Sequence, residues 1–188
     1  MTLVYILIAV AVLFLFWAIG TYNGLINKKN KVEYAYSSID VMLKKRRDLI
    51  PNLVSSVKQY MTHEKELLER ITEARAGLMK DGISDKDRFN MENQLSGMLG
   101  QIKVAVENYP ELKANENVMQ LQASLNEVEE QISASRRAFN ATVLDINNGI
   151  EMFPSSIVAN FMKLERRESF EIPPEERENV NVGDLFNG

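Results

Sequence analysis

An unbroken run of apolar residues from Leu3 to Ile19 opens the chain, and no charged side chain occurs before Lys28. A bilayer core about 30 Å thick is crossed by roughly 20 helical residues, so the uncharged stretch 2–26 is long enough to span it. After this stretch charged residues recur every few positions. The pattern therefore predicts one transmembrane helix, which includes Leu3, Trp17 and Ile19, followed by a water-soluble part.

A cleaved signal peptide is the alternative, because the segment 18–20 resembles a small-x-small cleavage site. The length of the run and the absence of Lys or Arg before it favour a retained anchor. Cationic flanks of a span stay in the cytoplasm, so we expect a single pass through the inner cell membrane with the amino terminus outside and the bulk of the chain cytoplasmic. The flanking lysines either contact lipid headgroups or only fix this topology; they are Lys28, Lys29 and Lys31.

Beyond the anchor, apolar residues recur at three- and four-residue spacing, which is the period of a helix. The first stripe runs from Tyr36 to Leu78 and predicts a long helix that continues out of the anchor. Pro51 lies inside it and lacks a backbone N–H, which predicts a kink near Arg47 or a break followed by a new first turn. A turn is expected over residues 80–85.

Two further stripes follow this turn. The second begins after Ser84, a good helix cap, and stops at Pro110; the third runs from Val118 to Ile150 and stops at Pro154. A short amphipathic helix is expected at 157–162. No alternation typical of a strand persists, so the fold class is all-α: an N-terminal transmembrane helix continuing into an elongated antiparallel bundle of three to four long helices.

Three regions result from this pattern. They are the anchor at residues 1–27, the cytoplasmic helical bundle at residues 28–167, and an extended carboxyl-terminal tail at residues 168–188. The tail is rich in Glu, Pro and Asn, and its apolar residues are expected docking points: Phe170, Ile172, Val180, Val182, Leu185 and Phe186.

The composition limits the partners, metals and catalytic groups that the chain can be expected to use. A net charge of −4 and a pI near 5.2 argue against a nucleic-acid partner, which needs a basic face. Cysteine is absent and His63 is the single histidine, which disfavours thiolate, zinc and iron chemistry. His63 stands near Glu64, Glu66 and Glu69 but lacks the spacing of a di-iron bundle. We therefore expect no catalytic residue, no metal and no cofactor.

The most distinctive stretch places charged residues beside the apolar line of the first stripe. Arg46 and Arg47 lie between Leu43 and Ile50, so a partly buried guanidinium is expected, and it needs an acidic or amide partner. The facing candidates on the third stripe are Asn140, Asp145 and Asn147. A structural polar layer that fixes helix register is the favoured interpretation and a ligand site the alternative; its expected members are Asp40, Arg46, Arg47, Asp48, Asn140 and Asn147.

Several blocks along the chain resemble the LemA family of bacterial membrane proteins. The two most specific blocks are Arg46-x-Asp48-Leu49-Ile50-Pro51-Asn52-Leu53 and Tyr109-Pro110-x-Leu112-x-Ala114-Asn115. Others are Tyr22-Asn23, Ile39-Asp40, His63-Glu64, Ala74-Arg75, Arg136-x-x-x-Asn140 and Phe153-Pro154. The resemblance implies a single membrane anchor that carries a helical bundle, with the bundle inside the cell. It implies no catalytic residue. Similar proteins are associated with envelope maintenance and membrane-protein quality control, so it implies partners such as membrane proteases.

Three functional hypotheses follow. The first is a non-enzymatic, membrane-tethered scaffold or adaptor that assembles as a homo-oligomer and serves envelope or membrane-protein homeostasis. The second is a module that senses a signal or a small anion at Arg46 and Arg47. The third, a bundle metalloenzyme, is kept because helical bundles often carry metals in their cores.

Overall fold

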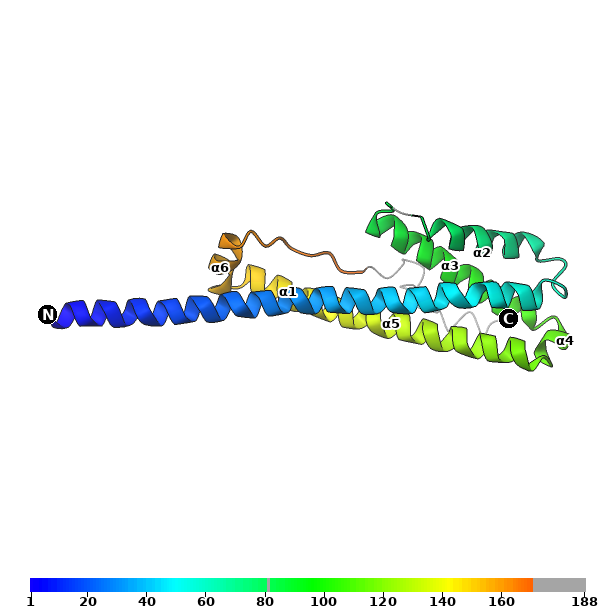
Figure 1. Ribbon diagram of the computed structural model, residues 1–188, viewed down its shortest axis with the longest axis horizontal. Helices are drawn as coiled ribbons and strands as arrows, with labels where there is room; N and C mark the ends of the chain where they lie inside the picture. Colours follow the sequence, from blue (N-terminus) through cyan, green and yellow to red (C-terminus); the bar gives the residue numbers. More distant parts are fainter. Residues whose placement is uncertain (81, 171–188) are drawn as a thin grey trace, which may run out of the picture. The chain divides into compact units, whose positions relative to one another are not determined.

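The computed structural model describes residues 1–80 and 82–170, which form helices and no strand. The predicted all-α class is confirmed (Figure 1). The helices are α1 (Thr2–Val57), α2 (Lys65–Gly77), α3 (Asp85–Val106), α4 (Pro110–Lys113), α5 (Glu116–Glu151) and α6 (Ser155–Phe161). Most of the expected docking points lie outside the described residues; Phe170 is the exception.

The chain divides into two compact units. We call Met1–Glu33 with Arg137–Gly188 the anchor unit, and Tyr34–Arg136 the bundle unit. Helices α1 and α5 each contribute one part to each unit. The boundaries expected at residues 27 and 167 concern membrane location and stay a prediction.

The amino-terminal part of α1 has the properties of a membrane span. It is long and apolar enough to cross a bilayer, and every residue from Met1 to Phe16 is exposed. Leu3 and Phe16 are each 69% exposed, which would be costly for apolar side chains in water. This helix indicates a single-pass membrane protein.

After the span, α1 buries one side chain every three or four residues. The buried positions in its bundle-unit part follow the predicted stripe, and they are Ala35, Ile39, Leu43, Arg46, Ile50, Leu53 and Val57. The helix continues through Pro51 without a break, so the expected new first turn does not occur. The carbonyl of Arg47, which would accept from residue 51 in a regular helix, instead accepts a hydrogen bond from Arg75 Nε at 2.9 Å.

This contact gives a direct test. Arg75→Met should leave the Arg47 carbonyl without a partner and lower the free energy of unfolding by about 1–3 kcal/mol. Pro51→Ala restores an N–H that can donate to the same carbonyl, so Arg75→Met should cost much less in that background. Chemical denaturation of the four chains in detergent measures this coupling. Equal costs in both backgrounds would contradict the role given to Arg75.

The first predicted stripe is divided between two helices, contrary to expectation. Helix α1 ends at Val57, and α2 begins at Lys65 and runs back along the bundle unit (Figure 1). The turn buries Met61 completely, and α2 buries Leu68 and Ile71 in the same core cluster as Leu53 and Val57 of α1. A continuous helix would have carried these side chains past the bundle. Tertiary burial therefore ends the helix where no glycine or proline does.

The predicted start of α3 is confirmed, and a side-chain cap also begins α5. Ser84 Oγ accepts a hydrogen bond from the Asp87 amide at 3.1 Å and caps α3. Asn115 Oδ1 accepts from the amides of Asn117 and Val118, at 3.0 and 3.3 Å, at the start of α5. In the bundle unit, α1, α2, α3 and α5 alternate in direction (Figure 1), as predicted for an antiparallel bundle.

In the anchor unit α5 approaches α1 closely. A Cβ atom on Gly149 would lie 2.9 Å from Leu25 Cδ2, so the glycine permits this approach. Helix α6 follows, and Lys163 takes a left-handed conformation with φ of 53°. The amides of Lys163 and Leu164 donate to the carbonyls of Asn160 and Ala159, both at 3.1 Å, which is the Schellman arrangement that ends a helix and reverses the chain.

Candidate functional site

The most unusual side chain of the bundle unit is Arg46, a fully buried cation in the core stripe of α1. Its Nη2 donates to the Glu92 carboxylate and to the Glu92 carbonyl, the latter at 3.1 Å. Its Nη1 donates to Ser96 Oγ and to Glu129 Oε2, the latter at 2.7 Å. A guanidinium carries several donors in a planar fork, so one side chain holds α1, α3 and α5 together.

The acidic partners of Arg46 also have further contacts. Glu92 is fully buried and accepts from Arg47 Nη1 at 3.0 Å. Glu129 accepts from Ser96 Oγ at 3.0 Å and keeps 44% of its side chain exposed. We call these residues the Arg46 network: Arg46, Arg47, Glu92, Ser96 and Glu129. Two cations and two carboxylates balance, which is the condition for tolerating buried charge.

The balance of charges in the Arg46 network also bears on whether it can bind a small anion. Both Nη atoms of Arg46 and Nη1 of Arg47 already bind carboxylates. A small anion would have to displace one of these carboxylates. Displaced from the network, the buried Glu92 would lose its counter-charge in the core, and Glu129, which is 44% exposed, would have to leave Arg46 Nη1. The geometry therefore favours the structural polar layer over an anion site.

In the structure Arg46 is fully buried and Arg47 is half-buried, and their partners are not the expected ones. Asp40 pairs with Arg88 at 3.2 Å, and the Asp48 side chain is exposed. Asn140, Asp145 and Asn147 lie in the anchor unit and have partners there, described below.

One sequence signal could have identified the missing carboxylate. Glu92 lies three residues after Phe89 and three before Leu95, on the apolar line of the second stripe. A lone acid at a core position requires a buried cation, and Arg46 is the matching position on the first stripe. Glu129 follows buried Val128 and gave no comparable signal.

Asn140 and Asn147 together hold the chain that follows α6. Asn147 donates to the Arg167 carbonyl and accepts from the Arg167 amide, both at 2.9 Å. Asn140 does the same with Phe170, at 3.1 and 2.8 Å. Seven residues of helix rise about 10 Å, and three extended residues cover about the same length. This match lets two helical amides act as an asparagine clamp on one face of α5, and the Phe170 ring packs edge-on against Phe139 with centroids 4.8 Å apart.

The expected lipid-contacting lysines have different environments. Lys28 forms an ion pair with Asp145 of α5, and Lys29 lies 3.9 Å from Glu33 one turn later. Lys31 is exposed. Their contact with lipid stays a prediction.

In the span, Trp17 is partly buried and its ring centroid is 5.3 Å from that of Phe14. Ile19 is 48% exposed.

His63 is exposed, and no group of three or more metal-ligating side chains occurs in the parts of the chain that the structure describes. Its neighbour Glu64 instead accepts a hydrogen bond from Tyr109 Oη at 2.6 Å. The absence of a metal stays a prediction, and elemental analysis of purified protein tests it.

This hydrogen bond predicts a dependence on alkaline pH. The bond to Glu64, followed by burial and by the negative charge of Glu64, raises the pKa of Tyr109 above its ordinary value of 10.0. The folded state therefore holds the phenol proton more tightly, so stability is full below pH 10 and falls as the pH rises through the folded pKa. Denaturation curves should show a smaller alkaline loss for Tyr109→Phe than for the unmodified chain. Identical pH profiles would contradict the prediction.

Comparison with known proteins places this arrangement in a family. Residues 35–183 match the model of the LemA family. Protein LemA of Metamycoplasma hominis is 27% identical over 93% of this chain and 80% of its own. Magnetosome protein MamQ of Magnetospirillum gryphiswaldense is 24% identical over 91% of this chain and 74% of its own. Magnetosome protein MamQ 2 of Paramagnetospirillum magneticum is 24% identical over 81% and 65%. The family match covers most of the chain, including the Arg46 network and the asparagine clamp, and the chain therefore belongs to the LemA family.

Proposed function

We propose that this LemA-type protein is a non-enzymatic, membrane-anchored scaffold that assembles with copies of itself. The observation that carries this is the course of α1, because one unbroken helix supplies both the exposed apolar span and a core element of the bundle unit. The names of the relatives, protein LemA and magnetosome protein, specify no reaction. The buried charges of the Arg46 network are matched to one another rather than presented to a substrate.

The location follows from the basic flank. The span is followed directly by Lys28, Lys29 and Lys31, and under the positive-inside rule this supports a cytoplasmic bundle unit with the amino terminus outside the inner membrane. In this position the protein serves envelope or membrane-protein homeostasis, with other membrane proteins such as membrane proteases as further partners. Protease digestion of sealed inverted and right-side-out vesicles tests the orientation.

The surface for self-assembly is a groove of about 680 Å³ at the end of α1 and along α2. Buried or half-buried Val54, Met61 and Leu68 line it. Exposed charges of both signs also line it: Lys58, Lys65, Glu69 and Glu73. Two cations and two anions on one patch can pair across a two-fold axis, in which the same surface meets itself. A second copy of the chain is therefore the occupant that we propose.

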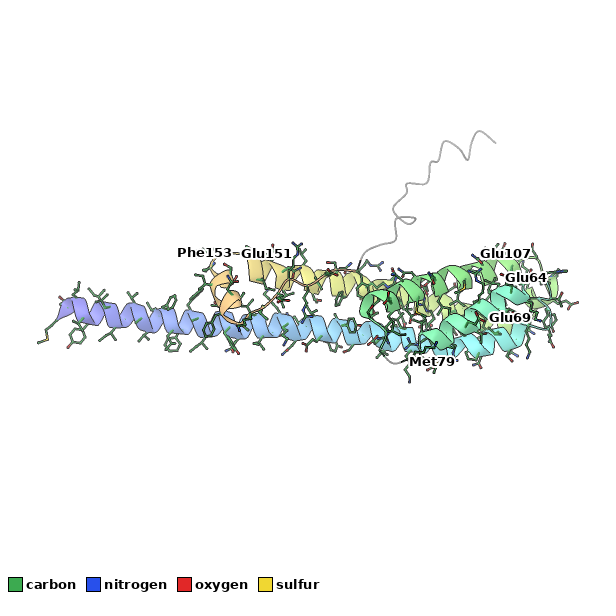
Figure 2. The ribbon with its side chains drawn as sticks, turned by 90° about the horizontal axis from the view of Figure 1, so that it is seen from above. Glu64, Glu69, Met79, Glu107, Glu151 and Phe153 are labelled. Atoms are coloured by element: carbon green, nitrogen blue, oxygen red, sulfur yellow. The ribbon has the colours of Figure 1, made fainter. Side chains whose placement is uncertain are left out.

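The test is the mass of the detergent-solubilised full chain after subtraction of the micelle. We expect a mass of at least twice the 21.4 kDa of one chain. Glu69→Lys with Glu73→Lys makes the groove wholly cationic and should shift the protein to the monomer. Glu107→Lys is the matched control, because Glu107 is also exposed and lies at the end of α3 outside the groove (Figure 2). A monomeric unmodified chain at micromolar concentration would overturn the proposal.

A further inference from the structure

Helix α6 and the turn before it expose large apolar side chains. Phe153 is 81% exposed, Ile157 is 54% exposed and Phe161 is 87% exposed. They are four residues apart, so a single helical face carries the last two and the turn before it carries the first. We call these three residues the α6 patch.

The opposite face of α6 is already packed. Ala159 is fully buried, and Val158 and Met162 are partly buried. A helix that is apolar on both faces is not typical of a surface helix in water, where one face is polar. The outer face therefore requires a second apolar environment.

The position of α6 along α1 identifies that environment. Gly149, near the end of α5, meets Leu25, which is six residues beyond the end of the apolar run. Helix α6 follows directly and lies beside α1 in both views (Figures 1 and 2). Trp17, Ala18 and Thr21 are partly buried, whereas every residue of α1 before them is exposed. The anchor unit thus begins to cover α1 near the end of the apolar run, which closes at Ile19.

We propose that the α6 patch inserts into the headgroup layer of the bilayer that α1 crosses. Aromatic side chains favour this layer, because their rings tolerate an apolar side and a wet side. The segment after the patch is polar, which suits the wet side of the headgroup layer. Its exposed charges are of both signs: Lys163, Glu165, Arg166, Arg167 and Glu168. Two contacts, the span and the α6 patch, would fix the anchor unit against the membrane. The proposal rests on the membrane anchor of the proposed function.

The test uses the absence of cysteine in the chain, since each introduced cysteine is then the single labelling site. Full-length Phe153→Cys and Phe161→Cys chains carry an environment-sensitive fluorophore in vesicles of phosphatidylcholine with about one third phosphatidylglycerol. Quenchers are lipids with a nitroxide at a shallow or a deep acyl position, and iodide in the water. Leu7→Cys reports on the span. Met79→Cys is the aqueous control, because Met79 is 62% exposed in the bundle unit (Figure 2).

We expect both patch labels to be quenched several-fold more by the shallow lipid than the Met79 label, and several-fold less by iodide. The Leu7 label should respond to the deep lipid. A quenched Leu7 label with patch labels that behave like the Met79 label would overturn the inference while the anchor stands. Patch labels shielded from iodide but insensitive to lipid would mean that protein covers the patch, which also overturns it. Loss of deep quenching at Leu7 would overturn the anchor itself, and the inference with it.

Discussion

Arg46→Met should lower the free energy of unfolding by about 3–5 kcal/mol, the largest effect that we expect of any single change. The substitution leaves the fully buried Glu92 carboxylate with Arg47 as its remaining cation, and an under-compensated charge in the core is strongly destabilising. Chemical denaturation of the full chain in detergent, followed by far-ultraviolet circular dichroism, measures it. Lys45→Met is the matched control, because Lys45 is the preceding residue of α1 and is exposed.

A second variant separates the effect of the buried charges on stability from the effect of packing. Arg46→Met combined with Glu92→Leu removes both buried charges and should recover most of the stability, since hydrophobic replacement of a buried ion pair is often neutral or stabilising. Glu129→Gln should cost much less than Arg46→Met, because the Gln amide oxygen can still accept from Arg46 Nη1 and solvent screens the charge of a side chain that is 44% exposed. A double variant no more stable than Arg46→Met would show that the arginine contributes shape rather than charge compensation.

Asn140→Ala with Asn147→Ala should release the segment that follows α6 and cost about 2–4 kcal/mol, from four hydrogen bonds of about 1 kcal/mol each. Hydrogen exchange detects the loss of these bonds more specifically than the free energy of unfolding does. Hydrogen exchange at the Arg167 and Phe170 amides should lose its protection, while exchange in the bundle unit stays unchanged.

The exposed neighbour Asn148 supplies the control for this pair. Asn148→Ala changes the same residue type one position along α5 and should leave exchange at Arg167 and Phe170 unaltered. Retained protection in the double variant would mean that the Phe139–Phe170 ring contact holds the segment without the amides.

The residues of the candidate site show how much of that site the sequence predicts. The spacing of Leu43, Arg46 and Ile50 predicted a partly buried cation in a core stripe, and in the structure Arg46 is fully buried. Its partners could not be assigned, because helical periodicity gives the face of each helix but not which helices meet or at what height. Asn140 and Asn147 were expected to face the arginines and instead bind the backbone of the returning segment.

Pro51 shows the same limit at the level of one backbone group. Its missing N–H was read correctly, but the consequence depended on whether another donor could reach the Arg47 carbonyl. Arg75 reaches it from α2, at a sequence separation of 28 residues. Local rules predict where a helix is weakened, whereas a tertiary contact decides whether it breaks.

The sequence by itself determined the apolar span, the all-α class, the cap at Ser84 and the long helix α5. Each of these depends on residues close together along the chain, through period, capping and hydrophobic length. The tertiary structure alone decided the end of α1 at Val57, the partners of Arg46, the asparagine clamp and the exposed face of α6. Each of these depends on which surfaces are covered, and burial is set by residues far apart in sequence.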